Sequence, residues 1–96
     1  MAFKVLYHED ALADLEAIFE RSRDKHPETT EQFAKDLFNH IDLLGAFPNF
    51  GAPVRGRPGV RRLLHSPLII YYEVDEIRGC VEILHFWHGS RRAPFQ

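Results

Sequence analysis

The strongest constraint in the sequence is a change in the spacing of apolar residues along the chain. Apolar side chains recur every three or four residues from about Glu9 to Arg23, and again from Phe33 to Leu44. This is the spacing of amphipathic helices. Pro27 suits the first position of the second helix and Gly45 suits its end. Because the link between the two is short, we expect an antiparallel helical hairpin.

Short strands are expected before and after the hairpin. Segments 3–7, 60–65, 68–74 and 81–87 are rich in aliphatic, β-branched and aromatic residues. Segment 68–74 is apolar on both faces over most of its length, which is typical of a central strand. The order β-α-α-β-β-β indicates an α+β fold over residues 1–96, as one domain. In this fold the helical hairpin packs on one face of a small, mostly antiparallel sheet, and the other face is partly open.

Two further patterns refine this expectation. Residues 46–59 hold three prolines and three glycines, which predicts an irregular loop, and we expect Phe47 and Phe50 to pin that loop to the body. In the last strand, strict alternation would place Val81, Ile83, His85 and Trp87 on one face.

Composition excludes several classes of protein. A chain of 96 residues with 45% apolar and 27% charged residues is typical of a soluble globular domain. No apolar run is long enough to span a membrane, and the N-terminus does not resemble a signal peptide. The single cysteine, Cys80, cannot form an internal disulfide, so a cytoplasmic location is expected. Glycine-rich phosphate loops and zinc-binding patterns are missing, so we expect neither a cofactor nor a metal.

The charges are distributed unevenly. Residues 1–50 hold five basic and ten acidic residues, whereas residues 51–96 hold seven basic residues, all arginine, and four acidic ones. Arginine binds phosphate or carboxylate through two parallel hydrogen bonds. We therefore place the candidate binding surface in the second half, with the residues Arg61, Arg62, Tyr72, Trp87, Arg91 and Arg92. Neighbours on a strand face opposite ways, so at most one of Arg61 and Arg62 joins a given site, and one tyrosine of the pair 71–72 belongs to the core.

Three residues near the C-terminus are candidates for catalysis. His85 and His88 could move a proton near neutral pH, and Arg91 could hold a phosphate, which together would support phosphodiester cleavage. The alternative is that His85 is a half-buried structural histidine beside Trp87. Both interpretations stay open from the residues alone.

An ordered set of motifs along nearly the whole chain resembles the RelE/ParE superfamily. The set ends with an aliphatic-Tyr-Tyr strand at 70–72 and with the sequence His-Gly-Ser-Arg at 88–91. The superfamily contains the toxins of type II toxin–antitoxin, or plasmid stabilisation, modules. The resemblance implies the fold described above. It also implies a cognate antitoxin that forms a hetero-oligomer with the chain and wraps the helical hairpin and the sheet edge.

The superfamily divides by target, and the resemblance implies a branch. RelE-type members cut mRNA on the ribosome, whereas ParE-type members poison DNA gyrase. Leu68 or Ile69 stands where RelE-type toxins carry a catalytic arginine, and Phe95 stands near the position of their C-terminal tyrosine. These departures favour a ParE-like, non-enzymatic inhibitor of gyrase. The alternatives are a RelE-like ribosome-dependent mRNA endonuclease and an inactive module that only binds its antitoxin.

Overall fold

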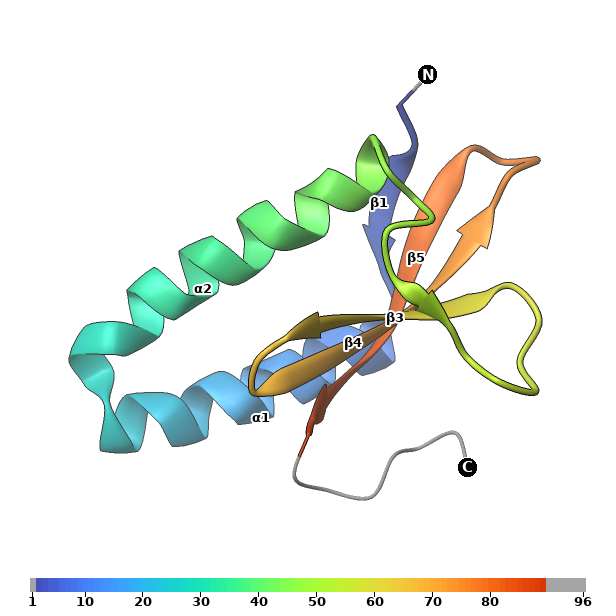
Figure 1. The fold of residues 1–96 in the computed structure, drawn as a ribbon. Helices are drawn as coiled ribbons and strands as arrows, with labels where there is room; N and C mark the ends of the chain where they lie inside the picture. The colour runs from blue at the N-terminus through green and yellow to red at the C-terminus, as the bar shows by residue number, and fades with distance from the viewer. Residues whose placement is uncertain (1, 90–96) are drawn as a thin grey trace.

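The computed structural model of the chain describes residues 2–89 (Figure 1). Its elements follow the predicted order, with a short 3₁₀ turn (η1) after the second helix and one additional short strand. In chain order they are β1 (Lys4–Tyr7), α1 (Glu9–Lys25), α2 (Pro27–Asp42), η1 (Leu43–Gly45), β2 (Ala52–Pro53), β3 (Val60–His65), β4 (Leu68–Asp75) and β5 (Cys80–His88). The predicted α+β fold is therefore confirmed.

The strands form one sheet in the order β1-β5-β4-β3-β2. The first and last strands lie side by side and run parallel, while the other neighbours are antiparallel. Figure 1 shows β1 in blue against β5 in orange, with the helical hairpin inserted between them in sequence. The parallel pair arises because the chain leaves β1, passes through the whole hairpin and returns to the same edge.

The hairpin begins and turns at polar caps. The His8 ring accepts a hydrogen bond from the Asp10 N–H (3.0 Å) and so caps the start of α1. His26 alone links the two helices, and Pro27 opens α2 without losing a backbone hydrogen bond. Beside this link, the hydroxyls of Ser22 and Thr30 are 2.7 Å apart, which joins the helices where apolar packing ends.

Both helices pack on one face of the sheet. Apolar residues of the hairpin meet a row that crosses three strands, Leu63 on β3, Ile70 on β4 and Phe86 on β5. Each such side chain contributes roughly 2 kcal/mol when it is fully buried. The buried residues of the hairpin side are Ala11, Leu15, Phe19, Leu37, Ile41 and Leu44.

A bulge in β5 changes which residues face the helices. Tyr71 pairs with His85, but Tyr72 pairs with Ile83, so Leu84 is an extra residue in the last strand. The predicted alternation of β5 is wrong for this reason. Ile83 lies in the core, whereas His85 shares the opposite face with Tyr71.

The loop between η1 and β3 also differs from expectation. Phe47 and Phe50 were expected to hold it against the body, but they are 60% and 58% exposed. Polar contacts from Arg61 and Tyr72 hold the loop instead. Neither helix of the described range is long and apolar enough to cross a membrane.

Candidate functional site

The sheet face opposite the helices carries several of the predicted site residues. Two rows cross it from β3 through β4 to β5, because residues paired across antiparallel strands share a face. The rows are Arg62–Tyr71–His85 and Leu64–Ile69–Trp87. We call these six residues the open face. Neighbouring strands lie about 4.8 Å apart, so the backbone positions of Arg62 and His85, which are two strands apart, are separated by roughly 10 Å.

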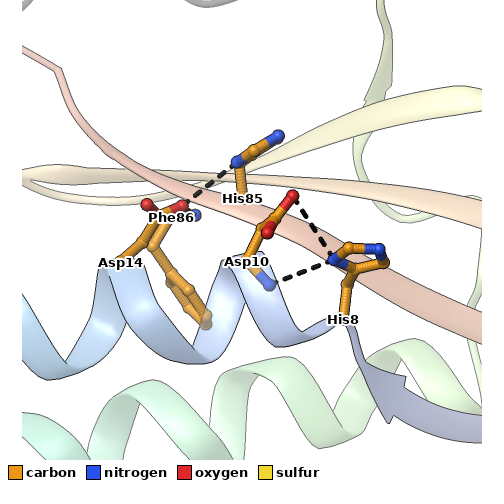
Figure 2. Close-up of polar contacts among 5 residues, drawn as sticks. All are labelled: His8, Asp10, Asp14, His85 and Phe86. Atoms are coloured by element: carbon orange, nitrogen blue, oxygen red, sulfur yellow. Dashed lines mark hydrogen bonds and ion pairs between the residues drawn. The ribbon is translucent and has the colours of Figure 1, made fainter.

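A carboxylate from α1 completes the edge of the open face. β1 pairs with β5 only as far as Ile83, which leaves the rest of that edge without a neighbouring strand. Asp14 occupies this position, and its Oδ2 accepts a hydrogen bond from the Phe86 N–H (3.2 Å) and lies 3.1 Å from His85 Nδ1 (Figure 2). The carboxylate therefore replaces a strand as the hydrogen-bond acceptor and orients the imidazole, so that Nε2 points away from α1.

Figure 2 also shows a second histidine–aspartate pair, which has a different role. His8 and Asp10 lie at the first turn of α1, with 3.6 Å between His8 Nδ1 and Asp10 Oδ2. Both side chains are more exposed than those of Asp14 and His85. The pair His8–Asp10 caps the helix, so a variant of His8 can serve as a control for a variant of His85 in the pair Asp14–His85.

A groove of about 660 Å³ runs between the helical hairpin and the end of β5. Its floor is apolar and includes Ile18, Phe33 and Trp87, while Arg21 and Lys25 add positive charge. We call it the hairpin groove. The other lining residues are Asp14, Ala17, Phe19, Ser22, His26, Thr29, Pro67, Leu68, Phe86 and His88.

The predicted binding and catalytic residues are therefore divided among separate places. His88 lines the hairpin groove, His85 and Arg62 lie on the open face, and Trp87 belongs to the open face and also lines the groove. Arg61 faces the other way, and its Nη1 donates to the Gly51 carbonyl (2.7 Å). Residues Arg91 and Arg92 lie outside the described residues.

Tyr72 requires a correction, because it was proposed as a contact residue. Its side chain is fully buried on the helix side of the sheet, where its hydroxyl donates to the Pro48 carbonyl and accepts from the Gly51 N–H, both at 2.8 Å. Burial raises the pKa of the Tyr72 phenol, so the hydroxyl keeps its proton at neutral pH. Tyr71 lies on the opposite side of the sheet, in the row Arg62–Tyr71–His85, and it is also buried, with 2% of its surface exposed.

The structure adds a histidine pair that the sequence did not indicate. His40 on α2 and His65 on β3 place their Nδ1 atoms 2.8 Å apart. Burial lowers the pKa of His65, and the neighbouring His40 lowers it further against an opposing effect of Asp36. Within residues 2–89 no group of three or more histidine, cysteine, aspartate or glutamate side chains is placed to hold a metal ion.

Comparisons with known proteins agree with this fold. A family model described as the ParE toxin of the type II toxin–antitoxin system, parDE, matches residues 5–93. A search among curated protein sequences finds no significant match.

Three solved structures share the fold at low sequence identity. The chromosomal ParDE toxin–antitoxin system from P. aeruginosa contains a chain that is 24% identical, with a TM-score of 0.77 over 91% of this chain and 96% of that one. The RelBE2 toxin–antitoxin complex of Mycobacterium tuberculosis gives 21% identity and a TM-score of 0.63 over 92% and 99% of the two chains. The isolated E. coli RelE toxin gives 20% identity and a TM-score of 0.59 over 97% of this chain and 89% of that one.

Proposed function

The chain belongs to the ParE toxin family of type II toxin–antitoxin systems, and on that premise we propose that it binds DNA gyrase and stalls the enzyme on cleaved DNA. The family match over residues 5–93 is the observation that carries this proposal. The toxin acts in the cytoplasm and is silenced by a cognate antitoxin in a hetero-oligomer.

The chemistry of the open face supports binding to a target protein. The face combines Arg62 with Trp87, and arginine and tryptophan are the residue types that contribute most at protein interfaces. Ile69 lies at its centre, where the nuclease branch is expected to carry a polar group. An inhibitor that acts by binding needs no catalytic arginine at that position.

The hairpin groove suits the antitoxin. Its apolar floor can bury the apolar face of a segment that folds on binding, and the cations Arg21 and Lys25 complement acidic residues on such a segment. Trp87 forms part of the floor. Trp87→Ala should therefore weaken antitoxin binding at least about tenfold, which corresponds to 1.4 kcal/mol. Ile77→Ala, which changes a fully exposed apolar residue in another hairpin, is the matched control and should have no effect.

The gyrase proposal is tested with purified toxin, gyrase and relaxed plasmid. We expect the toxin to inhibit ATP-dependent supercoiling, and we expect addition of the cognate antitoxin to restore it. A toxin that leaves supercoiling unchanged but cuts mRNA in a translation extract would refute the proposal.

A second candidate function, ribosome-dependent cleavage of mRNA, is favoured by one observation. Asp14 orients His85, which is how a general base is positioned, and Arg62 lies in the same row two strands away, where arginine is the residue type that binds a phosphate. For this function, His85→Ala should abolish cleavage in a translation extract. His8→Ala removes the other histidine of a histidine–aspartate pair and should leave cleavage intact. If His85→Ala cuts mRNA like the wild type, His85 is not the general base, and a wild type that cuts no mRNA excludes this second function.

A further inference from the structure

The loop that follows η1 exposes a group of large apolar side chains. Phe47 and Phe50 are about three-fifths exposed, and Leu43 is 45% exposed one turn before them. The Phe47 N–H donates to the Leu43 carbonyl (2.8 Å), so these residues are close together. We call Leu43, Phe47 and Phe50 the phenylalanine surface. Apolar side chains that gather on a surface in this way mark contacts with other molecules.

The backbone beneath this surface is fixed by buried groups. The Tyr72 hydroxyl holds both the Pro48 carbonyl and the Gly51 N–H, and Arg61 Nη1 donates to the Gly51 carbonyl. A Cβ atom on Gly51 would lie 2.4 Å from the Arg62 carbonyl oxygen, which no side chain tolerates. The loop is therefore held in one conformation although its phenylalanines point outward.

Contacts with α2 also restrict the Phe50 ring. The His40 ring meets it edge to face, with 6.2 Å between the ring centroids. His40 is itself held against His65 of β3. An aromatic anchor that is already oriented loses little entropy on binding, and anchors of this kind supply most of the binding energy at an interface.

The charge of the surrounding chain indicates the chemistry of the partner. Residues 43–72 contain four arginines and neither lysine nor any acidic residue, although the whole chain has a net charge of −2. Arg55 and Arg62 of this stretch are exposed. An acidic protein surface with apolar pockets complements this combination.

The phenylalanine surface lies away from the hairpin groove. The groove involves Thr29 and Phe33 near the start of α2, whereas the loop follows the end of that helix (Figure 1). The 16 residues of α2 span roughly 24 Å. One partner can therefore occupy the groove while another contacts the loop.

We infer that the phenylalanine surface docks onto an acidic surface of the protein that the toxin inhibits, and that binding of the antitoxin does not depend on it. The inference rests on the proposed function, because it assigns a place of contact for the target.

The test compares the wild-type toxin with the double variant Phe47→Ala, Phe50→Ala, and with Ile77→Ala as a control for loss of an exposed apolar side chain. Five properties are measured for each: melting temperature, growth arrest on induction, inhibition of gyrase supercoiling, affinity for the antitoxin, and retention on plasmid DNA without gyrase. Because both phenylalanines are exposed, the double variant should melt close to the wild-type temperature. We expect it to lose growth arrest and to need at least about tenfold more protein to inhibit gyrase, while its antitoxin affinity changes less than about threefold.

Other results overturn the inference. A double variant that arrests growth like the wild type shows that the surface is not used. If the double variant also loses affinity for the antitoxin, the surface belongs to the antitoxin. If the wild type binds plasmid DNA without gyrase and the double variant does not, the surface binds nucleic acid. If the wild type arrests growth without inhibiting gyrase, the proposed target is wrong. The inference is then decided by growth alone: it holds if the double variant no longer arrests growth, and it fails if the double variant still does.

Discussion

Replacing Tyr72 with phenylalanine removes a single oxygen atom, and the structure predicts a large effect. That oxygen donates to the Pro48 carbonyl and accepts from the Gly51 N–H. Losing the first hydrogen bond costs about 1 kcal/mol, and leaving the buried Gly51 N–H unpaired costs about 1–3 kcal/mol. The free energy of unfolding should therefore fall by about 2–4 kcal/mol, and the melting temperature by at least about 8 °C.

The measurement is urea unfolding followed by circular dichroism, together with hydrogen exchange at the Gly51 amide. Tyr7→Phe removes the same atom from a half-buried tyrosine elsewhere and should cost less than about 1 kcal/mol. In Tyr72→Phe the Gly51 amide should exchange much faster than in the wild type, because the loop is released. A variant whose stability lies within about 0.5 kcal/mol of the wild type, with a protected Gly51 amide, would refute the idea that this tyrosine holds the loop.

Three further predictions follow from single contacts. Asp14→Ala leaves the Phe86 N–H at the edge of β5 without its acceptor, and should lower the free energy of unfolding by about 1–2 kcal/mol in urea, with Asp14→Asn intermediate. Gly51→Ala forces a Cβ against the Arg62 carbonyl, and a thermal melt should show a loss of about 1–3 kcal/mol; a melt like that of the wild type would contradict the close approach. His65 has a lowered pKa in the folded state, caused by burial and then by the histidine beside it, so the unfolded chain binds this proton more readily. Stability should therefore fall as the pH drops below about 6.5, and His65→Gln should flatten this part of the pH profile relative to the wild type.

The order of the elements could be predicted because it depends on local patterns. Helical spacing, Pro27 and Gly45 define the hairpin within each segment, and the apolar segment 68–74 defines the central strand. The short strand β2 was missed because it consists of Ala52 and Pro53, which are poor strand formers outside a sheet edge.

The faces of the strands could not be predicted, because they depend on pairing between strands. Leu84 fits the alternation of β5 in the sequence, and only its lack of a partner on β4 reveals the bulge. The adjacent residues Tyr71 and Tyr72 have the same preference for a strand. Their division between the open face and the core is decided by the bond of Tyr72 to a loop more than twenty residues earlier.

The candidate site was only partly visible for the same reason. The second half of the chain does supply Arg62, His85 and Trp87 to the open face. Asp14 joins them from 71 residues away along the chain, and in the sequence it is one of several acidic residues at the start of a helix. Nothing in its local pattern separates it from its neighbours.

The proposed action on gyrase is tested most directly by trapping the enzyme on its DNA. Supercoiled plasmid is incubated with gyrase and the toxin, the enzyme is denatured rapidly, and linear DNA with covalently attached protein is measured. The account predicts linear DNA in proportion to the toxin added, lost when the antitoxin is present in equal amount. Intact plasmid at every toxin concentration, from a preparation that arrests growth in cells, would contradict it.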